Sequence, residues 1–444
     1  MFHSHAKYLL ILLLITGGVR LSAQTTTSSG TNTSDPLTGR ENDPYSKFGI
    51  GDLQNGNSTV LKGMGNITSA FENPFEVNSD NPASYSFLKR VTYEAGFTAS
   101  SRSIDAAGES YTTGTATISY LTLGIPINKN AGICLGFRPY SHTYYNLADT
   151  LQNSAIGQAE RLYTGTGSMN YAYIGGAYRF KGLSIGVNVG YMFGNFNDIT
   201  AIVPVDTQAY NRAYTTEYTN YNRIGGIYWK AGLMYETKID SDYTICIGGT
   251  LTLMQSLSQR YTPLQISSYN FGDTLVEDTT NNPGQQQGKL KMPMSYSIGA
   301  ILSKNNKWDV GLDYSATRWS QFNSTLISDT SISNSVAKQQ FKISLGGEYT
   351  PDINNTRNYF SRVTYRFGLY YGNDYLNISG TQLPMYGLTA GASLPFRRSD
   401  SRVHLALEVG RMGSTSNGLI EETYVRFSLG LSFCNSWFIP RKYE

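Results

Sequence analysis

The hydrophobic pattern from residue 89 onward alternates with a period of two. In the clearest run, Leu183 to Gly194, aliphatic and aromatic residues at odd positions alternate with small or polar residues at even positions. Successive strand residues point to opposite faces, so this run predicts a β-strand with one apolar face. The same alternation recurs in 91–99, 227–235, 243–253, 308–314, 341–349, 363–371, 386–394, 403–409 and 425–433, and less regularly in 112–125, 131–146, 158–180 and 290–304.

These runs predict an all-β fold, a 14-stranded antiparallel transmembrane β-barrel with an N-terminal plug in the lumen. A tilted strand needs about 9–11 residues to cross a bilayer, and bacterial barrels have an even number of strands, short periplasmic turns and long outer loops. Every second predicted connection is short, at 126–130, 179–182, 238–242, 304–307, 351–358 and 397–400. Long outer loops are expected at 197–218, 259–289 and 321–336.

The segment 45–88 differs from the rest because it is rich in glycine and shows neither a helical nor a strand period, although it carries apolar residues such as Phe48, Met64 and Phe71. Irregular backbone needs hydrogen-bond partners to stay ordered. Barrels of about 8 strands fill with side chains, whereas those of about 16–18 enclose water, so a 14-stranded wall leaves room for an internal segment. We therefore predict a plug at 45–88 and a barrel wall at 89–444.

The first residues predict a secretory targeting signal. Lys7 precedes the apolar run 8–15, and Leu21, Ser22 and Ala23 follow, as in a secretory signal peptide at 1–23. A membrane anchor is the alternative, but the run is shorter than the roughly 20 residues of a spanning helix. Residues 24–44 are polar and Thr/Ser-rich, which predicts a flexible tether. We expect a multi-pass protein of the outer membrane of a Gram-negative bacterium.

Composition supports a membrane barrel. Aromatic residues make up 13% of the chain, with 34 tyrosines, and charged residues only 15%, below the roughly 25% of soluble domains. The formal net charge of +3 gives no sign of a nucleic-acid partner.

Charged residues in the predicted strands fall on the face opposite the apolar one. Facing lipid would cost about 2–4 kcal/mol for each Arg or Lys at the midplane, so we expect them to face the lumen. They form either a polar path or a neutralising network that holds the plug, and their mixed signs favour the network. These residues are Glu94, Arg138, Lys230, Asp309, Asp313, Lys342, Glu348, Arg366, His404, Glu408 and Arg426.

The sequence predicts no enzyme, no catalytic residue, no metal site and no cofactor. Only His142 and His404 follow the signal peptide. His142 is expected at the barrel rim near an outer loop. His404 and Glu408 share a strand face but lie about 13 Å apart at about 3.3 Å per residue, too far for a dyad.

The segment ending in Asn81, Pro82 and Ala83, directly before the first of the strand runs, resembles the FadL-type outer-membrane channels. That resemblance implies passive uptake of hydrophobic, fatty-acid-like molecules past an N-terminal plug. The long tether and the tail at 437–444 are more similar to PorV-like relatives, which implies a non-transporting scaffold that docks proteins of outer-membrane secretion or assembly machinery.

An apolar patch in a predicted outer loop is the candidate capture site for a hydrophobic ligand, with a loop folded over the barrel mouth as the alternative. It comprises Ile199, Ala201, Ile202, Val203 and Val205. The candidate partners are therefore outer-membrane lipids, a hydrophobic small molecule, and outer-membrane or periplasmic proteins.

Overall fold

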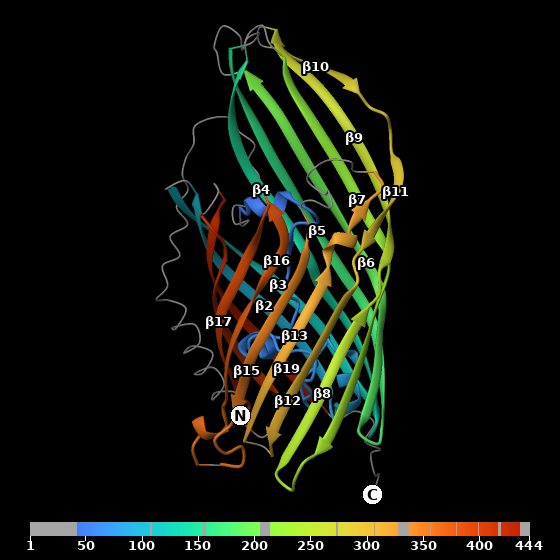
Figure 1. The fold of residues 1–444 in the computed structure, drawn as a ribbon, viewed down its shortest axis with the longest axis vertical. Coiled ribbons are helices and arrows are strands. Elements are labelled where there is room, and N and C mark those ends of the chain that lie inside the picture. The colour runs from blue at the N-terminus through green and yellow to red at the C-terminus, as the bar shows by residue number, and fades with distance from the viewer. Residues whose placement is uncertain are drawn as a thin grey trace, which may run out of the picture. The chain divides into compact units, whose positions relative to one another are not determined.

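Hydrogen-bonded strands close the chain into a β-barrel (Figure 1). The computed structural model describes residues 42–435, except 107–108, 154–156, 205–213, 272–273, 306, 327–336, 356, 379, 398 and 416–418. The predicted signal peptide, the tether up to residue 41 and the tail at 437–444 lie outside the described residues. No helix in the described part is long and apolar enough to cross a bilayer.

The wall confirms the predicted 14-stranded antiparallel barrel, because several shorter strands continue one another along the same line. Eleven strands cross the wall individually: β2 (Val91–Ala106), β3 (Glu109–Asn128), β4 (Ala131–Asn153), β5 (Gly157–Phe180), β6 (Leu183–Pro204), β7 (Thr215–Lys238), β15 (Gln339–Tyr349), β16 (Thr364–Ile378), β17 (Thr381–Pro395), β18 (Arg402–Gly413) and β19 (Glu421–Asn435). The other three are composite: β8 (Tyr243–Thr252) with β9 (Gln255–Phe271); β10 (Thr274–Asn281) with β11 (Gln286–Met292) and β12 (Ser295–Lys304); and β13 (Trp308–Arg318) with β14 (Asn323–Ser324).

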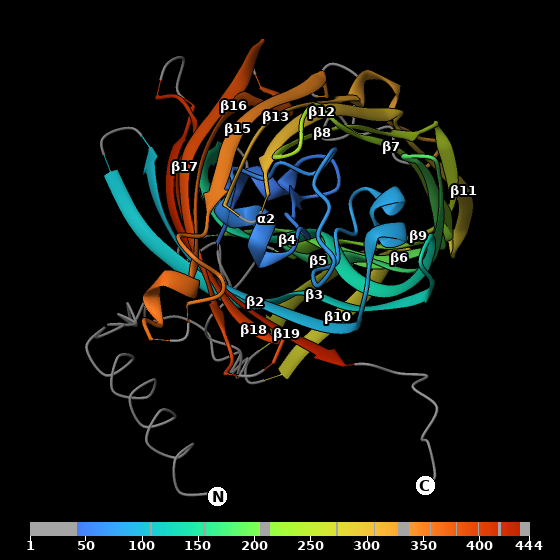
Figure 2. The ribbon, with the colours of Figure 1, turned by 90° about the horizontal axis from the view of Figure 1, so that it is seen from below.

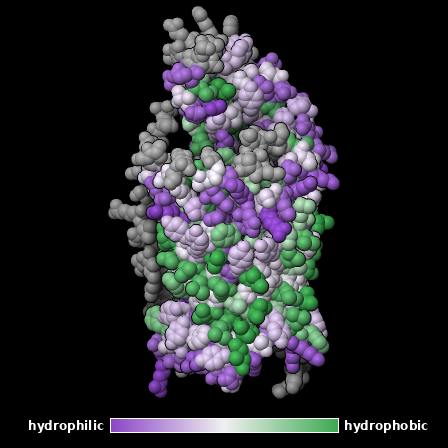
Figure 3. Space-filling model, viewed as in Figure 1, coloured by the Kyte–Doolittle hydropathy of each residue, from purple (hydrophilic) through white to green (hydrophobic). Residues whose placement is uncertain are grey.

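The ring closes where β19 pairs with β2, from Glu421 opposite Asp105 to Asn435 opposite Val91. In β6, exposed and buried residues alternate from Leu183 onward, as the sequence pattern predicts. Apolar residues gather in a band over the lower half of the molecule, and hydrophilic residues dominate above it (Figure 3). A bilayer fits this band.

The short turns lie at one end of the barrel, which we call the periplasmic end. At the turn between β5 and β6, Lys181 and Gly182 have φ angles of 47° and 88°. Phe180 pairs directly with Leu183. Two positive φ angles in a two-residue hairpin match the right-handed twist of the flanking strands, so this turn is as tight as the sequence predicts.

The predicted long outer loops are largely wrong, because the strands continue beyond the apolar band. β6 runs to Pro204, paired with β7 up to Ile202 and with β5 up to Pro204. The stretch 259–289 is mostly β9, β10 and β11, and the start of 321–336 holds β14. These Thr- and Tyr-rich polar segments satisfy their backbone groups on neighbouring strands instead of in water.

Residues 42–88, here called the N-terminal segment, lie inside the ring (Figure 2). The segment holds η2 (Pro44–Lys47), β1 (Asp52–Leu53), α2 (Thr59–Gly63) and η3 (Pro82–Phe87). Ser58 caps α2 by accepting the Leu61 N–H, and Asn81 caps η3 by accepting the Ala83 N–H. Asp43 and Pro44, the last residues of the predicted tether, are already buried.

The apolar residues of the segment build a small core against the wall. Leu61, Met64 and Ile67 are fully buried, and the cluster reaches Met234 and Cys246 on the wall. Burying such side chains contributes roughly 1.5–3 kcal/mol each. The lumen thus contains a packed core in addition to polar contacts. Two further short helices lie outside the N-terminal segment: η4 (Trp319–Gln321) and η5 (Phe360–Arg362).

Candidate functional site

The barrel wall is incomplete between β3 and β4. Their pairing runs only from Leu121 opposite Phe137 to Asn128 opposite Ala131, although both strands continue well beyond it on their other sides. Two local features explain the separation. Pro139 on β4 has no N–H to donate to a neighbour. In addition, the β2–β3 pairing shifts register at Gly96 and the β4–β5 pairing shifts at Pro139, which bends β3 and β4. We call this opening the β3–β4 seam.

The N-terminal segment occupies part of the seam. Asp52 and Leu53 of β1 pair with His142 and Ser141 of β4. Toward the outer end, the Asn42 carboxamide accepts the Asn146 N–H at 2.9 Å and donates to its carbonyl at 3.2 Å. A side-chain amide therefore satisfies the β4 edge as a strand would. His142 lies within β4 beside this segment, so its predicted place near an outer loop is wrong.

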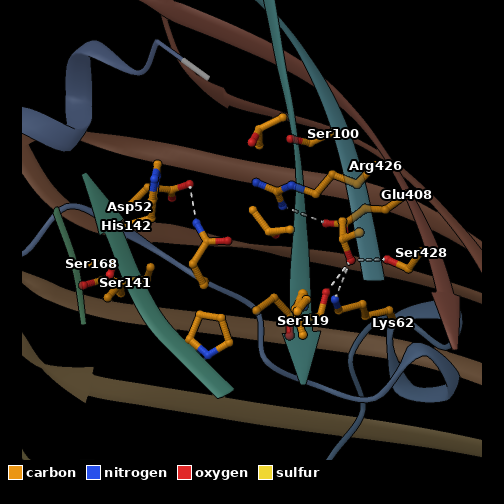
Figure 4. A pocket seen from close by; sticks show the side chains of 18 of the residues that line it. Asp52, Lys62, Ser100, Ser119, Ser141, His142, Ser168, Glu408, Arg426 and Ser428 are labelled. Carbon is orange, nitrogen blue, oxygen red and sulfur yellow. Dashed lines mark hydrogen bonds and ion pairs between the residues drawn. The ribbon is translucent and has the colours of Figure 1, made fainter. Parts of the chain in front are cut away.

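A cavity of about 210 Å³ lies at the seam (Figure 4). Lys62, Glu408 and Arg426 line it on the lumen side, and Ile118, which is 46% exposed, lines it on the outward side. The cavity thus reaches from the lumen to the face that meets lipid. Hydroxyl groups line about half of the remaining wall: Thr98, Ser100, Thr115, Thr117, Ser119, Ser141, Ser168 and Ser428.

Two further cavities divide the lumen. An outer cavity of about 330 Å³ shares Gln54, Asn55 and Pro139 with the seam cavity. A periplasmic cavity of about 410 Å³ shares no lining residue with either. Thr68 lines the outer cavity and Ala70 the periplasmic one, so the N-terminal segment separates the two. The outer cavity therefore adjoins the seam, and the periplasmic cavity does not.

Lys62 is the notable charge of the seam cavity. Its amine donates to Thr98 Oγ1 at 3.0 Å, and no carboxylate of the described residues forms an ion pair with it. Glu408 is instead held by Arg426 at 3.4 Å and by the Tyr370 hydroxyl at 2.6 Å. Burial lowers the pKa of Lys62 to about 8, partly opposed by Glu408. The amine remains largely protonated at neutral pH and has donors to spare.

The predicted lumen-facing residues make three direct charged contacts with the N-terminal segment. Arg138 and Lys230 each lie 3.0 Å from Asp80 Oδ1. Arg366 lies 3.7 Å from Glu76.

Hydrogen bonds add to these ion pairs. Asp313 accepts the backbone N–H groups of Thr68 and Ser69, both at 2.7 Å. Glu94 accepts the Val77 N–H at 3.0 Å. The wall therefore contacts the segment at several levels along the lumen.

The other predicted residues face the lumen without such direct hydrogen bonds. Asp309 and Glu348 are register partners that line the periplasmic cavity, and Lys342 lines the outer one. His404, buried, lies between Ser393 Oγ at 2.5 Å and Ser432 Oγ at 2.7 Å, with Glu76 3.9 Å away. The sequence did not foresee this serine–histidine contact, since the three residues lie on three strands.

Arg102 is the most important residue that the sequence analysis missed. It is 1% exposed and lies 3.0 Å from Asp43, 3.1 Å from Asp52 and 2.5 Å from Glu422. It joins the start of the N-terminal segment to β2 and β19. Arg102 shares the parity of Glu94, so extending the predicted strand past Ala99 would have found it.

The Asn81-Pro82-Ala83 motif docks against glycines of the wall. A Cβ built on Gly186 would lie 2.5 Å from the Pro82 carbonyl, and one on Gly232 would overlap the Asn81 side chain. The Asn81 amide donates to the Ser69 carbonyl at 2.5 Å and to Leu233 on β7 at 3.3 Å. The backbone can approach this closely only because β6 and β7 carry glycine there.

The predicted capture loop is a strand, so its assignment as a loop is wrong. Ile199, Ala201 and Ile202 pair within β6 with both β5 and β7, and Val203 pairs with β5. Val205 lies outside the described residues. β-branched residues favour this extended pairing.

Comparisons with known proteins agree with the architecture. Solved structures with a similar fold include the Ralstonia pickettii toluene transporter TbuX (15% identity, 85% of this chain and 98% of that chain, TM-score 0.52) and the Pseudomonas putida toluene transporter TodX (16%, 88% and 100%, 0.52). A Pseudomonas aeruginosa FadL homologue is also similar (11%, 87% and 99%, 0.50). At these identities the likeness shows a FadL-type fold.

A search of curated proteins finds no match. The family described as BamG matches residues 7–444. Since that match spans the whole wall and the N-terminal segment, the chain belongs to the BamG family.

Proposed function

We propose that this protein is an outer-membrane channel for passive uptake of hydrophobic, fatty-acid-like molecules, which leave the lumen sideways through the β3–β4 seam. We also propose that residues 1–23 are the signal peptide that directs it there. The observation that carries the proposal is the seam cavity, which reaches from Lys62 in the lumen to the outward-facing Ile118.

The cavities favour a sideways route. The outer cavity adjoins the seam cavity, whereas the N-terminal segment separates both from the periplasmic end. A molecule entering from outside therefore meets the seam before it meets any path to the periplasm. The fold shared with two toluene transporters supports a hydrophobic cargo.

The lining suits a cargo with a polar head. A hydrocarbon would leave the hydroxyl groups and the Lys62 amine without new partners, which costs free energy in a closed site. A carboxylate head can accept hydrogen bonds from the amine while the chain points past Ile118 to the lipid. Charge-assisted bonds of this kind are about twice as strong as neutral ones.

The experiment measures entry of radiolabelled laurate into liposomes that contain the purified protein. Thr117→Trp places a large ring in the seam cavity and is expected to reduce the rate strongly. Ala116→Trp is the matched control, because Ala116 is the next residue of β3 and does not line the cavity. Equal rates for Thr117→Trp and the wild type would rule out the seam route.

A second variant isolates the head group. Lys62→Met is expected to slow laurate entry while leaving toluene entry unchanged. An equal effect on both molecules would show that Lys62 does not recognise the carboxylate, without bearing on the route.

A second candidate function is a scaffold for partner proteins of outer-membrane secretion or assembly machinery. It is favoured by the sheet of β5, β6, β7, β9 and β10 that stands beyond the apolar band, where Tyr218 and Tyr221, on the two opposite faces of β7, are 41% and 48% exposed. Exposed tyrosines are frequent in protein interfaces. Crosslinking on intact cells should then recover a stoichiometric partner that is lost in Tyr218→Ser/Tyr221→Ser, with laurate entry unchanged. Full recovery of that partner with the double variant would exclude this surface.

A further inference from the structure

A row of outward-facing side chains crosses five strands at the periplasmic end. It consists of Tyr243, Lys304, Trp308, Tyr349 and Tyr365, which are neighbours in the strand register from β8 to β16. Tyr349 and Tyr365 are 51% and 42% exposed. We call these residues the rim row. Aromatic residues at this level of a membrane barrel lie at the head groups of the bilayer.

Lys304 is the only cation in the rim row. Its amine lies 5.1 Å from the centre of the Tyr243 ring. The Tyr243 and Trp308 rings contact each other edge-on, with centroids 6.1 Å apart. These rings support the stem and amine of the lysine and hold the charge near the lipid surface.

The positive charge of Lys304 is not neutralised locally. In the part of the chain that the structure describes, no ion pair involves Lys304 or its exposed neighbour Lys307. Elsewhere at this end, Lys181 lies 5.3 Å from the ring of Phe180, which is 62% exposed. Basic residues beside outward-facing aromatics therefore recur at the periplasmic rim.

We propose that Tyr243, Lys304 and Trp308 form a binding site for the phosphate of an anionic phospholipid in the inner leaflet. The tyrosine hydroxyl, the indole N–H and the amine are all donors, as a phosphate requires. Lys304 and Trp308 also border the periplasmic cavity. Their register neighbours Tyr349 and Tyr365 are exposed on the outer face, so a lipid head group fits this row better than an acidic periplasmic protein. The site rests on the proposed membrane location but not on transport.

Native mass spectrometry tests the site on the full chain, purified in detergent and freed of lipid. Phosphatidylglycerol is added to the wild type and to Lys304→Gln, and phosphatidylcholine, which is zwitterionic with no net charge, serves as the comparison. A lysine near an anionic surface contributes about 1 kcal/mol, so the affinity for phosphatidylglycerol should fall about fivefold in the variant, seen as lower occupancy at subsaturating lipid. Phosphatidylcholine binding should change less, because its choline cation already neutralises the phosphate.

The matched control is Lys291→Gln, because Lys291 is an exposed lysine of β11 away from the periplasmic end. Equal phosphatidylglycerol occupancy in Lys304→Gln and Lys291→Gln would overturn the proposal. Inorganic phosphate at the same concentration should not displace the lipid. Displacement by phosphate alone would show a general anion site and would also overturn it. Neither result depends on laurate entry.

Discussion

The carboxylate of Asp313, on β13, accepts both the backbone N–H and the hydroxyl of Ser69, each at 2.7 Å. Asp313 is 4% exposed, so its charge is satisfied almost entirely by the N-terminal segment. Hydrogen bonds to a charged group contribute about 1.5–3 kcal/mol each.

Asp313→Ala should therefore release this part of the segment. We expect faster hydrogen exchange at the Thr68 and Ser69 amides, measured by mass spectrometry on the protein in detergent. Asp309→Asn is the control, since Asp309 faces the same lumen but has Glu348 as its register partner. Unchanged protection of both amides in Asp313→Ala would refute the assigned role.

Asp80 stabilises two partly buried cations, Arg138 and Lys230. Replacing it with asparagine leaves both without a countercharge, which typically costs about 3–5 kcal/mol. We expect Asp80→Asn to lower the thermal unfolding temperature and Lys230→Gln to recover part of the loss in the same chain. Asp149→Asn, which breaks a more exposed pair with Arg161, should have little effect.

The pH dependence of this contribution has a definite sign. Burial alone would raise the pKa of Asp80, but Arg138 and Lys230 hold it well below its usual range. Stability from a lowered carboxyl pKa is present above the unfolded pKa and is lost only as the pH falls through the folded one. The difference between wild type and Asp80→Asn should therefore be constant from about pH 5 to 8.

Glu72 should act in the opposite direction. Burial raises its pKa to about 7, and Glu236 adds to the effect while Arg179 and Lys89 oppose it. The folded state then binds a proton that the unfolded state has lost, so stability should decline as the pH rises from about 4.5 to about 7. Thermal unfolding across this range should show a smaller decline in Glu72→Gln. Identical profiles would show that Glu72 does not titrate here.

Gly186 should tolerate no side chain. A Cβ there would lie 2.5 Å from the Pro82 carbonyl, a contact with backbone that cannot rotate away. Gly186→Ala should displace the Asn81-Pro82-Ala83 motif and expose the segment to added protease. Gly176→Ala is the control, because the nearest atoms to its Cβ are 3.9 Å away. Equal cleavage of both variants would contradict the docking.

The sequence predicted the wall well because strand parity is set locally. Each residue of β6 faces lipid or lumen according to its position alone, so alternation from Leu183 gives both the strand and its orientation. The short turns could also be predicted, because they lie where the alternation stops between successive strands. The extent of the strands was underestimated because β6 beyond Asn195 carries apolar residues on both faces, as at Ile199 and Ile202, so alternation gives no signal there.

The site could be predicted only in part. Parity placed Asp313 and Arg138 in the lumen, but their partners Ser69 and Asp80 lie in a segment without period. The β3–β4 seam depends on Pro139 and on register shifts in two strands, which no single run reveals. Contacts between residues far apart in sequence are the part that local pattern does not determine.

The junction of β19 with β2 has a consequence for how the protein is made. Asn435 pairs with Val91, so the final hydrogen-bonded ladder joins residues separated by nearly the whole chain. Closing so long a loop is entropically slow. The N-terminal segment is synthesised before the strands of the wall. It must lie inside the barrel when the β19–β2 ladder forms. We therefore expect faults in the segment to arrest closure of the barrel rather than to weaken a finished one.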